Sequence, residues 1–190
     1  MRLFVAIVLP GAVKKALGSL SDDLAVPGTK VRWVRPDNTH LTLRFLGEVE
    51  ETKVRAIQEA SLSAAAGVKP FELTVEGVGA FPSLKKPRVI WVGVGRSAPL
   101  AALHGKLEDE FSRIGFPPEK KSWNPHLTIG RVKENWNLSS LEHKLSSAGF
   151  SPRTFPVDVL FLIKSDLRPE GPLYTRLKEI PLALDPSAAC

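Results

Sequence analysis

The sequence predicts an α+β fold built from two lobes. Strand-like and helix-like segments are mixed along the chain, without the strict alternation of a doubly wound parallel sheet. The chain also contains an internal near-repeat, since each half has a strand that opens with the same type of tetrapeptide. No low-complexity linker separates the halves, so we expect residues 1–190 to form a single bilobal domain.

The first half of the chain alternates between strand-like and amphipathic segments. Residues 3–9 are apolar and rich in β-branched side chains, which favours a buried strand. Residues 10–24 begin with proline and repeat valine and leucine at helical spacing, and a Pro-Gly pair follows them. Two strands are predicted at residues 31–34 and 39–45, with an Arg-Pro-Asp-Asn turn between them. A second helix is predicted over residues 52–65.

The second half continues this mixed order. The runs that predict strands are residues 71–75, 88–94, a segment that begins near His126, 157–163 and 174–180. Amphipathic helices are predicted over residues 100–114 and from residue 138 to near Gly149, where apolar side chains recur every three or four positions. The tail over residues 185–190 is expected to be frayed.

The composition is that of a globular protein from a reducing compartment. Hydrophobic residues make up 43% of the chain and charged residues 24%, which excludes wholesale disorder and a long coiled coil. The single cysteine, Cys190, cannot form an internal disulfide, and no secretion signal is recognised, so we predict a cytoplasmic location. No apolar run reaches the roughly 18 residues that a membrane-spanning helix needs, so no membrane partner is expected.

The repeated tetrapeptide carries the clearest chemical signal. It is His-Leu-Thr-Leu at residues 40–43 and His-Leu-Thr-Ile at residues 126–129. Successive side chains of a strand point to opposite faces, so each histidine shares a face with its threonine while the aliphatic residues enter the core. One His-x-Thr sequence on a strand is common and usually structural. Two copies with the same alternation, one in each half, indicate a functional site.

If the lobes face each other, His40, Thr42, His126 and Thr128 meet across one cleft. An imidazole titrates near pH 6.5, so one ring can be neutral while the other is protonated. Such a pair supports attack on phosphorus, in which one ring takes a proton from the nucleophile and the other protonates the leaving oxygen. The threonines can hydrogen-bond the non-bridging phosphate oxygens. This chemistry needs no metal, and the motifs lack the further ligands of a zinc or iron site.

Three residues that follow the motifs, Arg44, Arg131 and Phe45, are candidate substrate-binding residues, and a fourth, Gly130, could make room for a substrate. Arg44 has the strand parity of His40, so it can reach a phosphate, although a solvated edge arginine is equally expected. Arg131 has the opposite parity to its motif histidine and needs a bulge to face the cleft. Gly130 has the right parity and would let a substrate approach closely. Phe45 has core parity, and packing is favoured over stacking on a base.

The charge balance favours a polyanionic partner. The chain has 26 lysine and arginine residues against 20 acidic ones, a net charge of +6. Residues that could form a basic rim for a nucleic-acid backbone are Lys85, Lys86, Arg88, Lys120 and Lys121. Residues expected to be structural or exposed instead are Trp33, Trp91, Trp123, His104 and His143.

The paired motifs resemble those of the 2H phosphoesterase superfamily. More closely, the chain is similar to the RNA 2',3'-cyclic phosphodiesterases, historically called 2'-5' RNA ligases. The stretches that carry this resemblance are residues 40–48, 126–132, 1–7, 81–82, 87–91 and 171–174. Together they span nearly the whole chain.

The resemblance implies a bilobal, pseudo-symmetric fold with antiparallel sheets facing a central cleft and helices outside. It also implies opening of a 2',3'-cyclic phosphate at an RNA end to leave a 2'-phosphate, with no metal or cofactor. By this resemblance His40 is the general acid and His126 the general base, whereas the residues alone leave the two roles interchangeable. A monomer is expected, with no protein partner. The direction, hydrolysis or 2'-5' ligation, stays open.

Two other functions are compatible with the same residues. The substrate could be a small cyclic nucleotide or a cyclic phosphate of ADP-ribose. The chain could also be a non-catalytic RNA-binding module that uses a basic groove. Binding alone would not need two titratable imidazoles, so the sequence favours the enzyme.

Overall fold

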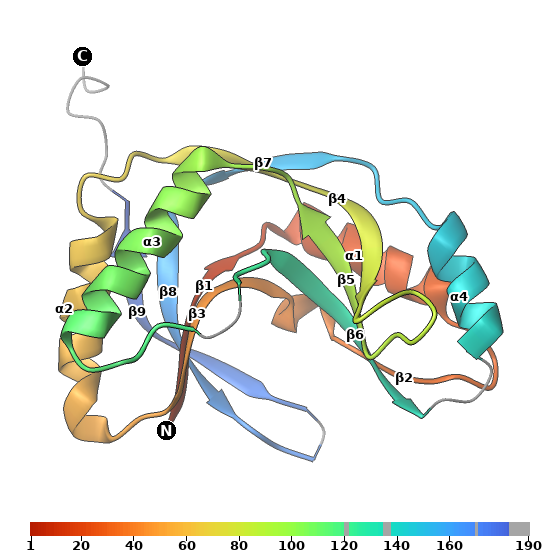
Figure 1. The fold of residues 1–190 in the computed structure, drawn as a ribbon, viewed down its shortest axis with the longest axis horizontal. Helices are drawn as coiled ribbons and strands as arrows, with labels where there is room; N and C mark the ends of the chain where they lie inside the picture. Colours follow the sequence, from red (N-terminus) through yellow and green to blue (C-terminus); the bar gives the residue numbers. More distant parts are fainter. Residues whose placement is uncertain (120–121, 135–137, 170, 183–190) are drawn as a thin grey trace.

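Two antiparallel sheets form the centre of the computed structural model, which describes residues 1–119, 122–134, 138–169 and 171–182 (Figure 1). One sheet has four strands in the order β3-β1-β8-β9, and the other has five in the order β2-β6-β5-β4-β7. The strands are β1 (Arg2–Val8), β2 (Lys30–Trp33), β3 (His40–Glu48), β4 (Phe71–Phe81), β5 (Val89–Val94), β6 (His126–Glu134), β7 (Arg153–Val157), β8 (Val159–Asp166) and β9 (Leu173–Pro181). The α+β class and the antiparallel sheets are therefore confirmed.

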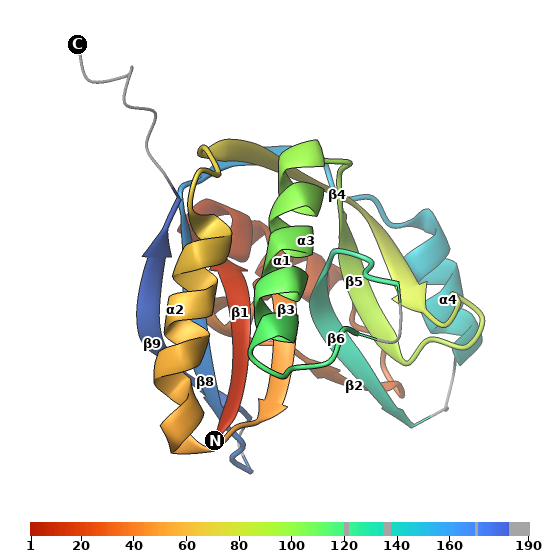
Figure 2. The same cartoon turned by 60° about the vertical axis from the view of Figure 1, so that its left-hand side comes forward.

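The helices cover the outer sides of the sheets. They are α1 (Gly11–Leu24), α2 (Val54–Ala65), α3 (Ala98–Arg113) and α4 (Leu138–Ser147). Helices α2 and α3 lie side by side along the four-stranded sheet, whereas α1 and α4 lie at the five-stranded sheet (Figures 1 and 2). Each helix buries the apolar stripe that predicted it, as in α3, where Leu100, Leu103, Leu107 and Phe111 are fully buried. None of the described helices is long and apolar enough to span a membrane.

The sheets draw their strands from both halves of the chain. The four-stranded sheet combines β1 and β3 with β8 and β9, and β2 joins the five-stranded sheet. The predicted strands at residues 31–34 and 39–45 thus exist, but they pair in different sheets, β2 with β6 and β3 with β1. The predicted strand at residues 157–163 likewise divides at Asp158 between β7 and β8. Apolar patterning marks these strands, but long-range burial selects their partners.

Strand β4 is longer than its sequence predicts. It continues from the expected end at Val75 as far as Phe81. Gly77 lies within it at φ +70°, next to a bulge between Glu76 and Val78. Only glycine adopts such a backbone angle without strain, so a residue that looks like a strand breaker lets the strand bend and continue. The predicted frayed tail at residues 185–190 lies outside the described residues.

Candidate active site

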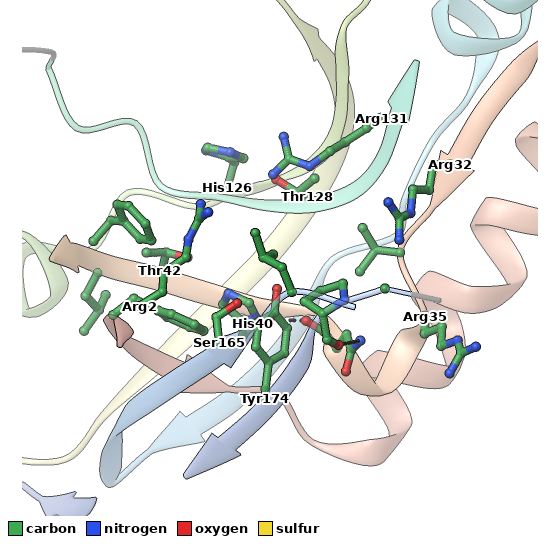
Figure 3. A pocket seen from close by; sticks show the side chains of 18 of the residues that line it. Arg2, Arg32, Arg35, His40, Thr42, His126, Thr128, Arg131, Ser165 and Tyr174 are labelled. Carbon is green, nitrogen blue, oxygen red and sulfur yellow. Dashed lines mark hydrogen bonds between the residues drawn. The ribbon is translucent and has the colours of Figure 1, made fainter. Parts of the chain in front are cut away.

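The paired motifs lie at the start of β3 and of β6, one in each sheet. Between the two sheets is a cleft of about 1500 Å³, lined by His40, Thr42, His126 and Thr128 (Figure 3). His126 and Thr128 lie on one side of it, and His40 on the other. The four residues that the sequence predicted to meet are therefore brought together.

Both imidazoles are held in the same way. His40 Nδ1 lies 2.8 Å from the carbonyl oxygen of Asn38, and His126 Nδ1 lies 2.7 Å from that of Asn124. A carbonyl oxygen can only accept, so each Nδ1 donates its proton to it. In a neutral ring Nε2 is then unprotonated and free to accept a proton, and in a charged ring it is a donor. Each histidine is thus prepared for proton transfer through Nε2.

The surroundings of the two rings differ. His40 stacks on Phe4 at a centroid distance of 4.7 Å and meets the edge of Tyr174 at 5.1 Å. Burial of the ring lowers the pKa of His40 from 6.5 to about 4, although the hydrogen bond to Asn38 opposes this change. His126 has one aromatic contact of this kind, with the edge of Phe81 at 5.0 Å. His40 is therefore neutral at pH 7 in the free protein.

The lowered pKa of His40 predicts a pH-dependent stability. Between pH 6.5 and about 4 the unfolded chain binds a proton at His40 and the folded chain does not. The free energy of unfolding should therefore decrease as the pH is lowered through this window. This group contributes at most about 1.4 kcal/mol per pH unit to the decrease. Urea unfolding at pH 7, 6 and 5 should show a shallower pH dependence for His40→Gln than for wild type, with the exposed His143→Gln as control. Parallel curves for wild type and His40→Gln would contradict the prediction.

A bulge interrupts the alternation of both motif strands at the same place. On β3, Thr42 pairs with Ala6 and Arg44 with Val5, which leaves Leu43 as the extra residue. Strand β6 has the equivalent irregularity opposite Ile90 and Trp91. Counted from each histidine as position one, the fourth and fifth residues are buried in both strands and the sixth, Phe45 or Arg131, is exposed. The bulge thus reverses which side chains face the cleft.

This reversal moves Arg44 away from the cleft, contrary to its strand parity. The buried guanidinium lies 2.6 Å from Glu108 Oε1 and 3.3 Å from Glu119 Oε1, and it also donates to the carbonyl oxygen of Pro117. It neither lines the cleft nor lies at a solvated edge. Arg44 therefore ties β3 to the segment that precedes β6, and the expectation that it reaches a phosphate is wrong.

The same reversal brings Phe45 and Arg131 to the cleft. Phe45 is 39% exposed, so the expectation that it packs in the core is wrong, and the Arg2 guanidinium lies 4.8 Å from its ring centroid. Arg131 lines the cleft through the bulge it was expected to need. A Cβ atom on the buried Gly130 would lie 2.9 Å from the Trp33 ring, so this glycine makes room for a tryptophan and not for a substrate.

Several cleft residues carry no local sequence signal. The side chains outside the motifs that line the cleft include Arg2, Phe4, Phe81, Ser165, Tyr174 and Arg168. They come from strands and loops that are distant in sequence, so no spacing rule connects them with the histidines. Trp33 and Trp123 also line the cleft, whereas Trp91 packs on Phe81 as expected of a structural residue.

The three described residues of the basic rim expected from sequence are not at the cleft. Lys85, Lys86 and Arg88 do not line it, and Lys120 and Lys121 lie outside the described residues. His104 is half-buried against the Trp123 ring at 4.0 Å, and His143 is exposed. Within the described part of the chain, no three His, Cys, Asp or Glu side chains gather where they could hold a metal ion.

Comparison with known proteins assigns the chain to one family. Residues 25–169 match the model of the 2'-5' RNA ligase superfamily. A protein of Thermotoga maritima named RNA 2',3'-cyclic phosphodiesterase is 38% identical over 94% of this chain and 94% of its own. A protein of the same name from Archaeoglobus fulgidus is 38% identical over 94% of this chain and 98% of its own.

Solved structures show the same similarity. The TT0787 protein of Thermus thermophilus superposes with a TM-score of 0.80 at 28% identity, covering 96% of this chain and 98% of the other. E. coli LigT in complex with 3'-AMP superposes with a TM-score of 0.76 at 28% identity, covering 95% of this chain and 97% of the other. The similarity therefore extends over both sheets.

Proposed function

The chain belongs to the 2'-5' RNA ligase superfamily, and we propose that its cleft opens the 2',3'-cyclic phosphate at an RNA end to leave a 2'-phosphate. The observation that carries this proposal is the pair of imidazoles in one cleft, each with Nδ1 bound to a carbonyl oxygen and Nε2 free for proton transfer. The relatives named RNA 2',3'-cyclic phosphodiesterase support the choice of substrate.

The reaction is a displacement at phosphorus with two proton transfers. A water oxygen attacks the phosphorus atom while Nε2 of His126 takes a proton from that water. The bond from phosphorus to the 3'-oxygen breaks, and Nε2 of His40 donates its proton to this oxygen. The products are a 2'-phosphate and a 3'-hydroxyl group. The threonine hydroxyls donate hydrogen bonds to the non-bridging oxygens, so no metal is needed to hold their charge.

The assignment of His40 as the acid requires the ring to be protonated in the complex. The pKa of His40 is about 4 in the free protein because the ring is buried. A bound phosphate places negative charge beside the ring, and an opposite charge raises the pKa of an imidazole. In this proposal the complex therefore takes up a proton at His40 when the cyclic phosphate binds. Ligation would use the same atoms with an RNA 5'-hydroxyl in place of water. The 5'-oxygen attacks phosphorus as His126 takes its proton, and the bond from phosphorus to the 3'-oxygen breaks as His40 protonates that oxygen, which leaves a 2'-5' phosphodiester.

The test is turnover of an RNA oligonucleotide with a 2',3'-cyclic phosphate end in the presence of EDTA. Phosphorus NMR distinguishes a 2'-phosphomonoester product from the 3'-isomer. We expect the 2'-phosphate to accumulate with wild-type protein and not with His126→Ala. A 3'-phosphate product, or a rate that EDTA abolishes and added divalent metal restores, would overturn the proposed mechanism.

The threonines should affect catalysis more than stability. We expect Thr42→Val and Thr128→Val to lower turnover roughly ten- to a thousandfold, as loss of one transition-state hydrogen-bond donor does. Valine keeps the shape and the strand preference of threonine, so the urea midpoint should stay close to that of wild type. Thr74→Val on β4, where Thr74 pairs with Thr154 outside the cleft, is the matched control. Wild-type turnover in both cleft variants would show that the hydroxyls do not contact the phosphate.

A further inference from the structure

Basic side chains gather in the part of the cleft beside the second half of β6, beyond the His126 motif. Arg32 on β2 pairs in register with Arg131 on β6, and Lys133 follows two positions later. Arg168 lies just after β8 and lines the same cleft. A Cβ atom added at Gly171 would lie 3.4 Å from Arg32 Nη2, so the segment between β8 and β9 meets β2 here. Arg32, Arg131, Lys133 and Arg168 are called the basic cluster.

The basic cluster is not neutralised by acidic side chains of the described residues. Like charges directly opposite each other on neighbouring strands repel, and Arg32 and Arg131 are such a pair (Figure 3). Among the residues that the structure describes, none of the four has an acidic partner. Glu119 is the single acidic side chain among the described cleft-lining residues, and it is already paired with Arg44. A bound anion would therefore relieve a repulsion that the fold leaves in place.

The cleft is larger than a terminal nucleotide requires. Its volume is about 1500 Å³, whereas sites for small molecules usually measure roughly 300–1,000 Å³. A cyclic phosphate placed between His40 and His126 leaves the part of the cleft beside the basic cluster for the rest of the substrate. In RNA, each further nucleotide adds one phosphodiester charge.

We propose that the basic cluster binds the phosphodiester groups upstream of the cyclic end, so that the enzyme prefers an RNA chain to a single nucleotide. This inference rests on the proposed function. Guanidinium groups bind phosphate oxygens through paired, charge-assisted hydrogen bonds. Such contacts carry no sequence information, so the preference is for length and not for base identity.

The experiment compares kcat/KM for a 2',3'-cyclic mononucleotide with that for di- and tetranucleotides that carry the same end. For wild type we expect kcat/KM to rise roughly tenfold or more with length. On the tetranucleotide, the logarithm of kcat/KM should fall with the logarithm of salt concentration by about 0.7 per bound phosphate. Arg32→Gln and Lys133→Gln should each reduce the ratio of tetranucleotide to mononucleotide kcat/KM at least threefold and make the salt slope shallower by about 0.7. Lys85→Gln makes the same change of charge outside the cleft and should alter neither quantity.

Each outcome separates this inference from the proposed function. Equal kcat/KM for all lengths would overturn the role of the basic cluster and leave the cyclic phosphodiesterase activity standing. A preference for a cyclic phosphate of ADP-ribose over the tetranucleotide would also overturn it. If no cyclic phosphate is turned over, the proposed function fails, and anisotropy of a labelled oligonucleotide with a 2'-phosphate end still tests the cluster. Equal affinity of wild type and Arg32→Gln for that probe would overturn the inference.

Discussion

His40→Ala is expected to lose at least roughly a hundredfold in turnover of a cyclic phosphate, the usual worth of a positioned acid. On a nitrophenyl phosphodiester it should lose much less. The acid is needed because a ribose alkoxide is a poor leaving group, whereas nitrophenolate departs without a proton. The base is needed for both substrates, because water is the nucleophile in each. His126→Ala should therefore stay impaired on both esters.

Steady-state rates of both variants on both substrates measure this difference. His143→Ala, a change to an exposed histidine on α4, is the control for loss of an imidazole. Rescue of His126→Ala instead of His40→Ala would mean that the two roles are exchanged. That result would agree with a His40 that is neutral in the free protein and stays neutral in the complex. Equal losses on both substrates would exclude this division of labour.

Arg44→Met should reduce the free energy of unfolding by about 3 kcal/mol, because removal of one partner leaves buried charges uncompensated. The Arg44 side chain is 6% exposed, and its partners Glu108 and Glu119 are 17% and 33% exposed. Glu119 keeps some contact with water, so the loss should lie at the lower end of the range for such pairs. Urea unfolding at pH 7 measures it.

Two further variants make this prediction specific. Arg55→Met removes an exposed pair with Glu59 on α2 and should change stability little, since exposed ion pairs contribute little. Adding Glu108→Gln and Glu119→Gln to Arg44→Met should recover part of the lost free energy of unfolding, because neutral amides then replace the unpaired carboxylates. If Arg44→Met were no more destabilising than Arg55→Met, Arg44 would not tie β3 to the segment before β6.

Much of the secondary structure and the centre of the site could be predicted from the sequence. The apolar stripes of α1 to α4 and the continuous apolar run of β1 are local patterns, and the structure buries them as predicted. His40 with Thr42, and His126 with Thr128, share a face because two positions along a strand always do. This relation depends on neighbouring residues alone, so it holds before the strand has found a partner.

The residues around that centre could not be predicted in the same way. Arg44, Phe45 and Arg131 follow their histidines by four or five positions, beyond a bulge in β3 or in β6. Such a bulge belongs to the pairing of two strands, here β1 with β3 and β5 with β6, and no local pattern records it. The basic cluster likewise needs β2, β6 and the end of β8 to meet. Alternation follows from the geometry of a single strand, whereas register and strand order follow from which distant apolar faces are buried together.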